Sequence, residues 1–164
     1  MQKLNFGESV EEIVQADRRY DRDAYYFVRE GLDFTIKMLK KDSHGAGRHV
    51  SGQELLEGLR RYALDQFGPM TKTVLTHWGV KRCEDFGEIV FHMVDKGILG
   101  KTEQDTPEDF KGGYDFDEVF VKPYQPLPRT RSHRLANKGE ASGKRYHSVP
   151  GRSSGAKKLS GGSN

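Results

Sequence analysis

The only cysteine of the sequence, Cys83, is the residue best suited to act as a covalent nucleophile. It lies where we expect a helix to begin, and a helix N-terminus can lower the pKa of a thiol. His77 and His92 are near it in sequence, but a histidine base must lie within hydrogen-bond reach of the sulfur. His92 follows Cys83 by about two and a half helical turns and so falls on the opposite face. We therefore interpret Cys83 as a small, partly buried thiol rather than a catalytic group.

The glycine-containing stretch 42–49 carries three residues of types that can ligate a metal, Asp42, His44 and His49. No second His or Cys pair follows at the spacing of a structural zinc site. The acidic run 103–110, "EQDTPEDF", lacks the glycine and the alternating oxygen ligands of a calcium loop. The sequence also contains no P-loop, no dinucleotide-binding glycine pattern and no common hydrolase or zinc-protease motif. We expect no metal, no cofactor and no enzymatic activity.

The strongest binding signal is the charge of the C-terminal segment 129–164. It carries nine Lys or Arg and one acid, Glu140, for a net charge of +8, whereas residues 1–128 carry a net charge of −5. Basic residues spread among small ones neutralise phosphates, and an aromatic ring can stack on an unpaired base. We predict nucleic-acid contacts from ten residues: Arg129, Arg131, Arg134, Lys138, Lys144, Arg145, Tyr146, Arg152, Lys157 and Lys158.

The same segment has too few apolar residues to bury. Six Gly and seven Ser stand among its 36 residues, so ordering it would cost more free energy than its apolar surface returns. We expect a disordered C-terminal tail over 129–164. The proline-rich stretch 123–128, "PYQPLP", is expected to be a linker, and residues 1–122 an acidic helical globular domain.

Helical spacing of apolar residues accounts for most of that domain. Two capping boxes, Ser9 with Glu12 and Ser51 with Glu54, mark helix starts. A glycine followed by an apolar residue, at 79–80 and 97–98, is typical of the Schellman ending, in which the second residue packs back on the helix. Five helices are predicted: 10–18, 23–41, 51–67, 70–78 and 83–96.

The helical period disappears after Leu99, and we expect a small β-hairpin over 98–121. Its two extended pieces would be "ILGKT" and "GYDFDEVFV", the second because Tyr114 and Phe116 alternate with acidic residues. The fold class is therefore mainly α with a small hairpin (α+β). The last three helices and the hairpin follow the element order of a winged helix; a small helical bundle with an appended hairpin fits as well.

The charges of this module argue against DNA binding. The region of the fifth helix, 81–96, has a net charge of −1, and the hairpin region, 98–121, has a net charge of −5. Phosphates would be repelled from both, whereas a DNA-reading helix and its wing should be basic. An acidic domain of this kind is better suited to docking a protein.

Three stretches carry a resemblance to a known family: "HVSGQELLEGLRRYALDQFGP", "VLTHWGVKRCEDFGEIVF" and "GGYDFDEVF". Together they resemble a family of small uncharacterised proteins restricted to planctomycetes and verrucomicrobia. The resemblance covers roughly residues 5–121 and leaves out the tail. It implies a shared fold and carries no residue roles.

We expect a non-enzymatic binding protein, whose acidic helical domain docks a protein and whose basic tail contacts RNA nonspecifically, ribosomal RNA being one candidate. The alternative is a pure protein-interaction or regulatory module without nucleic-acid binding, and an unrecognised enzyme is the third reading. The N-terminal stretch has no apolar signal region, no segment reaches membrane-spanning length, and a lone cysteine suits a reducing compartment. We therefore expect a cytoplasmic protein with no membrane partner.

Overall fold

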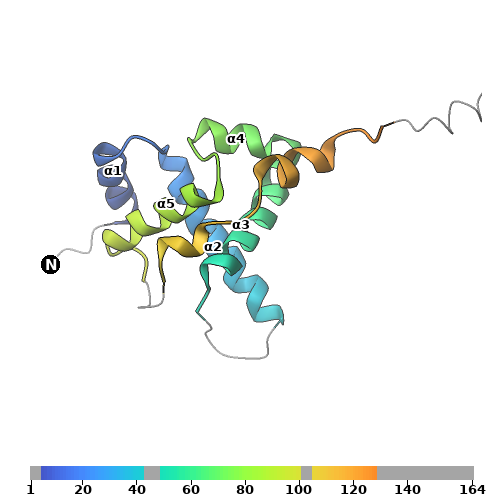
Figure 1. Ribbon diagram of the computed structural model, residues 1–164. Coiled ribbons are helices and arrows are strands. Elements are labelled where there is room, and N and C mark those ends of the chain that lie inside the picture. The colour runs from blue at the N-terminus through green and yellow to red at the C-terminus, as the bar shows by residue number, and fades with distance from the viewer. Residues whose placement is uncertain (1–4, 43–48, 101–104, 129–164) are drawn as a thin grey trace, which may run out of the picture. The chain divides into compact units, whose positions relative to one another are not determined.

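The computed structural model describes residues 5–42, 49–100 and 105–128, except for the side chains of Lys41 and Asp42. The chain divides into two units, Met1–Gln125 and Pro126–Asn164. The predicted disordered tail, 129–164, lies outside the described residues. Five α-helices are found in the part that is described, as the sequence predicts (Figure 1): α1 (Phe6–Ala16), α2 (Arg22–Asp42), α3 (Gly52–Phe67), α4 (Thr71–His77) and α5 (Cys83–Asp95).

The start of α3 confirms one predicted capping box, and the start of α1 corrects the other. The Ser51 hydroxyl accepts from the Glu54 amide at 3.2 Å, and the Glu54 carboxylate accepts from the Ser51 amide at 3.0 Å. Helix α1 instead begins at Phe6, and its N-cap is Asn5, four residues before Ser9, with Glu8 completing the box. Asparagine is as good a cap as serine, so the upstream box starts the helix first.

Ser9 consequently lies inside α1, where its side chain is buried and its hydroxyl has no hydrogen-bond partner among the described residues. We expect Ser9→Ala to raise the free energy of unfolding by about 1 kcal/mol, because it removes an unsatisfied buried hydroxyl and improves helix propensity. Urea unfolding followed by circular dichroism measures the change. Ser51→Ala is the matched control and should lower stability by about 1 kcal/mol through loss of the cap. A Ser9→Ala variant less stable than the wild type would contradict the assignment.

Both predicted Schellman endings are present. Gly79 has a φ of 85°, and the Val80 amide donates to the Leu75 carbonyl at 2.9 Å. After α5, Gly97 has a φ of 73°, and the Ile98 amide donates to the Met93 carbonyl at 3.0 Å. Glycine is suited to both positions because a side chain disfavours this left-handed conformation.

Helices α2 and α3 make the most extensive contact between any two helices of the described part. Glycines at their crossing allow the two backbones to approach closely. A Cβ at Gly58 would overlap Thr35 Oγ1 and lie 2.7 Å from Thr35 Cβ. A Cβ at Gly31 would overlap Leu59 Cδ2. Thr35 itself is buried and donates its hydroxyl to the Gly31 carbonyl at 2.6 Å, so the polar group at the crossing is satisfied.

Phe27 of α2 is the aromatic centre of the core. Its ring lies 5.3 Å from Tyr62, 5.6 Å from Trp78 and 6.3 Å from Phe86, measured between centroids. These partners come from α3, the end of α4 and α5, so one side chain joins three helices. Helix α5 contributes further residues without solvent exposure, Ile89 and Met93.

The predicted β-hairpin over 98–121 is wrong. The described residues contain no β-strand, and the region instead holds a 3₁₀ turn η2 (Pro107–Phe110), a π-helical turn η3 (Asp117–Val121) and a 3₁₀ turn η4 (Lys122–Tyr124). The winged-helix order, which needs the hairpin, is wrong with it. Residues 101–104, which the predicted hairpin included, lie outside the described part.

Capping and helical spacing explain this difference. The Asp115 carboxylate accepts from the amides of Asp117 at 2.9 Å and Glu118 at 3.1 Å, which caps a helical turn. Phe116 and Phe120, four residues apart, are both buried and meet edge to face at 5.1 Å. The alternation that indicated a strand therefore stops at Phe116, and a helical pair begins there.

Candidate functional site

The structure separates Cys83 from both histidines that could have activated it. Its side chain is buried, and its Sγ donates to the Tyr114 carbonyl at 3.3 Å. Burial raises the pKa of the Cys83 thiol to about 11, so the reactive thiolate is about 100-fold scarcer near neutral pH than for a free cysteine. His77 lies at the end of α4 and is exposed, while His92 contacts other residues. The interpretation of a buried thiol agrees with this geometry.

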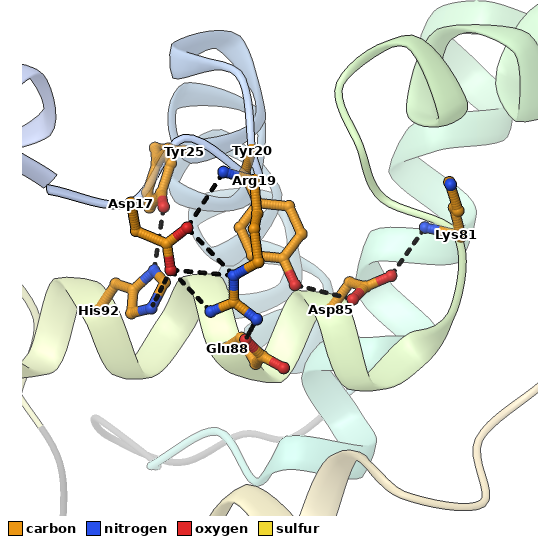
Figure 2. A network of polar contacts seen from close by, with 8 residues as sticks. All are labelled: Asp17, Arg19, Tyr20, Tyr25, Lys81, Asp85, Glu88 and His92. Carbon is orange, nitrogen blue, oxygen red and sulfur yellow. Dashed lines mark hydrogen bonds and ion pairs between the residues drawn. The ribbon is translucent and has the colours of Figure 1, made fainter. Parts of the chain in front are cut away.

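His92 of α5 belongs to a polar network that joins α5 to the connection between α1 and α2 (Figure 2). Its Nδ1 lies 3.0 Å from the hydroxyl of Tyr25, and its Nε2 lies 3.6 Å from Oδ2 of Asp17. The Asp17 carboxylate in turn accepts two hydrogen bonds from the guanidinium of Arg19, from Nε at 3.0 Å and from Nη2 at 2.7 Å. The remaining guanidinium nitrogen of Arg19, Nη1, lies 2.5 Å from Oε2 of Glu88.

The protonation states of this network follow from its surroundings. Hydrogen bonds from Arg19 lower the pKa of Asp17 to about 2, and burial raises the pKa of Tyr25 to about 12. Near neutral pH Asp17 is ionised and Tyr25 keeps its proton. The Tyr25 hydroxyl and Nδ1 of His92 share one hydrogen bond, and Nε2 of the same ring faces the ionised Asp17 carboxylate.

An Asp–His–hydroxyl order is also found in hydrolases, but here the hydroxyl is enclosed. Tyr25 has no solvent-exposed surface, so no substrate can reach its oxygen without opening the core. The arrangement therefore fixes the α1–α2 connection on α5. Sequence reasoning missed it because Tyr25 and His92 are 67 residues apart, and no local pattern signals such a pair.

A second branch of the network holds the start of α5. The Tyr20 hydroxyl donates to Asp85 Oδ1 at 2.7 Å, and Asp85 Oδ2 accepts from the Lys81 amide at 2.8 Å (Figure 2). The same oxygen accepts from the Arg82 amide at 3.1 Å. Burial is the main cause that raises the pKa of Tyr20, and its hydrogen bond to Asp85 adds to the effect. Through Asp85, Tyr20 of the α1–α2 connection therefore fixes the position of the backbone around Lys81.

Between these two segments lies an open groove of about 600 Å³, which we call the basic groove. One wall is the α1–α2 connection, and the other is the end of α4 with the turn into α5. The residues that line it are Val14, Gln15, Arg18, Arg19, Tyr20, Asp21, Arg22, Thr76, His77, Trp78, Gly79 and Lys81. Four of them are Lys or Arg and one is acidic, which is unusual for a domain whose overall charge is negative.

A smaller pocket of about 220 Å³ lies between α2, the start of α3 and α5, with mostly apolar walls. At its edge His49 Nε2 lies 3.0 Å from Asp105 Oδ1. Of the residues considered for metal ligation, His44 and the side chain of Asp42 lie outside the described part. No group of three or more His, Cys, Asp or Glu residues that could hold a metal ion occurs among the residues that are described.

The ten residues predicted to contact nucleic acid, from Arg129 to Lys158, all lie outside the described part, so their contacts stay predictions. Within the described ranges, no helix is both long and apolar enough to cross a lipid bilayer. Comparison with known proteins yields no matching family model, no matching curated protein and no matching solved structure.

Proposed function

We propose that the protein is a non-enzymatic binding protein that contacts RNA nonspecifically through residues 129–164 and docks a protein through its acidic domain. The observation that carries the proposal is the charge division, +8 in the tail against −5 in residues 1–128. A basic segment gains affinity by releasing counterions from phosphates, and it needs no fixed fold to do so. Ribosomal RNA is one candidate target. We place the protein in the cytoplasm, because a single cysteine suits a reducing compartment.

The acidic domain supports the protein-docking half of the proposal. Asp115, just before η3, and Asp117 and Glu118, at its start, are exposed. Two lysines, Lys72 and Lys122, pair with Asp117 and Glu118 respectively. The three carboxylates outnumber these two lysines by one. Such a face steers basic partners towards it and repels phosphates, which limits nonspecific nucleic-acid binding by the domain.

The salt dependence of RNA binding tests the tail. If about six of the nine tail bases meet phosphates, the log–log slope of affinity against salt is about −4 for a single strand. Affinity for a single-stranded RNA should then weaken on the order of 10²–10³-fold between 50 and 200 mM salt. Fluorescence anisotropy of a labelled oligonucleotide measures it.

A chain that ends at Leu127 provides the comparison, because it keeps the compact unit Met1–Gln125 and loses all nine bases. We expect it to lose nearly all RNA binding. A full-length chain with the nine bases replaced by Gln separates charge from length and should behave like the truncated one. Binding that survives both changes, or that ignores salt, would contradict the proposal.

A pure protein-interaction module is the second candidate, and exposed apolar side chains favour it. Met70 is 56% exposed and Tyr124 is 46% exposed, and exposed apolar groups are what a protein partner can bury. This candidate gains support if the full-length chain binds no RNA at low salt and its partner remains bound after nuclease treatment.

A further inference from the structure

The basic groove has preformed walls. The Asp21 amide donates to the Trp78 carbonyl at 3.0 Å, which joins the two sides of the groove directly. A Cβ at Gly79 would overlap the Arg19 carbonyl oxygen, so the two backbones also touch there. The network of Asp17, Arg19 and Glu88 holds the first wall on α5. A ligand would therefore meet a groove whose shape needs no ordering.

Only two of the four basic side chains that line the groove form ion pairs with described residues of the domain. Arg19 is neutralised by Asp17 and Glu88, and Arg22 pairs with Glu11 at 2.7 Å. Arg18 and Lys81, by contrast, are exposed, and neither side chain makes an ion pair with another described residue.

The carboxylate of the groove, Asp21, accepts from the Asp23 amide at 2.9 Å, next to the start of α2. Its charge opposes anion binding, yet it is outnumbered by the two unpaired cations. Arg18 and Lys81 come from opposite walls, because one lies in the α1–α2 connection and the other in the turn before α5. An anion in the groove would lie between them.

An aromatic side chain lines the same groove. Trp78 is half-buried, and its ring packs against Phe67 edge to face at 5.6 Å and against Phe27 at 5.6 Å. These contacts fix its orientation. Cations together with a fixed aromatic ring are the combination by which proteins hold single-stranded nucleic acid, since phosphates meet the cations and a base stacks or packs on the ring.

We propose that the basic groove is a second RNA contact, in which Arg18 and Lys81 hold phosphates of a single strand and Trp78 contacts a base. The inference rests on the proposed function, because the tail brings the RNA to the domain. A volume of about 600 Å³ is larger than one phosphate ion needs and is in the range of sites for nucleotide-sized ligands. The groove supplies few contacts, so it positions a strand that the tail holds.

The test uses the full-length chain and its only tryptophan. Trp78 is the single Trp of the sequence, so intrinsic tryptophan fluorescence reports on the groove and not on the tail. A short uridine oligonucleotide is titrated at about 50 mM salt, where phosphate contacts are strong. We expect its binding to change the emission of Trp78.

The variant Arg18→Gln with Lys81→Gln should lose most of that change and bind the oligonucleotide about tenfold less tightly, with a salt slope smaller by about 1.4. The matched control is Lys37→Gln with Lys40→Gln, which removes the same charge from exposed positions of α2 outside the groove. The control should bind like the wild type. Equal losses in both variants, or an unchanged Trp78 signal in the wild type with bound RNA, would overturn the inference.

Inorganic phosphate alone is the second probe, and it separates a strand from a free anion as the ligand. It should compete only weakly, and saturation of the Trp78 signal by phosphate alone would overturn the strand assignment. The tail variant with nine Gln separates the two proposals. RNA binding that depends on the tail but not on Arg18 and Lys81 defeats the groove alone, whereas a wild-type chain that binds no oligonucleotide defeats the proposed function and the groove with it.

Discussion

Gly58→Ala is expected to lower the free energy of unfolding by about 3–5 kcal/mol, a large share of the stability of a domain this size. The added Cβ would overlap Thr35 Oγ1 and lie 2.7 Å from Thr35 Cβ and 2.8 Å from its Cγ2. Rotation of Thr35 cannot relieve the contact with its Cβ, so α2 and α3 must separate. Alanine improves helix propensity by about 1 kcal/mol, which is too little to compensate. Chemical denaturation followed by circular dichroism measures the loss.

Two further variants show whether the clash is the cause. Gly100→Ala places a Cβ where no atom of a described residue lies within 4 Å, so it should leave stability within about 0.5 kcal/mol of the wild type. Thr35→Ala removes the overlapping Oγ1 and Cγ2, so adding it to Gly58→Ala should recover part of the loss. A Gly58→Ala protein as stable as the wild type would show that the helices do not cross this closely.

Gly79→Ala is expected to cost about 3–4 kcal/mol for two separate reasons. Its φ of 85° is a left-handed conformation, which costs an alanine about 1–2 kcal/mol. The new Cβ would also overlap the Arg19 carbonyl oxygen, which is backbone and cannot move away as a side chain could. The hydrogen bond from Asp21 to Trp78 would be lost with the separation. Thermal and urea unfolding measure the total.

Gly112→Ala separates these two costs. Gly112 has a φ of 64°, but a Cβ there would meet no atom within 4 Å in the part of the chain that is described. It should therefore show the conformational cost alone, and the difference between the two variants gives the energy of the backbone clash. Equal effects of the two substitutions would mean that the connection and the turn are not in contact.

The helices were predictable because their signals are local. Apolar residues at three- and four-residue steps and the box of Ser51 and Glu54 located α3, and the glycines at 79 and 97 located the ends of α4 and α5. The start of α1 was misplaced because two boxes overlap in sequence and only one can begin a helix. The segment after Asp115 was misread because Phe116 belongs to an alternating pattern and to a helical one at once.

The candidate site was not predictable in the same way. Arg18, Arg22 and Lys81 stand in two segments separated by about 60 residues, and each segment also carries acidic residues. The charge summed along 81–96 is negative, yet folding turns Asp85 and Glu88 towards Tyr20 and Arg19. A linear charge count therefore hides the basic groove, whereas it reveals the tail because those bases are contiguous.

The position of the α1–α2 connection has a thermodynamic consequence for α1. The connection that lines one side of the basic groove, through Arg18 to Asp21, also follows directly on the end of α1. Besides the buried packing of Val10 and Ile13, α1 is tied to the body by surface ion pairs, which contribute little, and by the network that holds Asp17 and Arg19 on α5. Undocking of α1 and loss of the groove should thus be a single sub-global opening. Any ligand that bridges the two walls then holds α1 in place, and by linkage whatever holds α1 raises the affinity of the groove by the same factor.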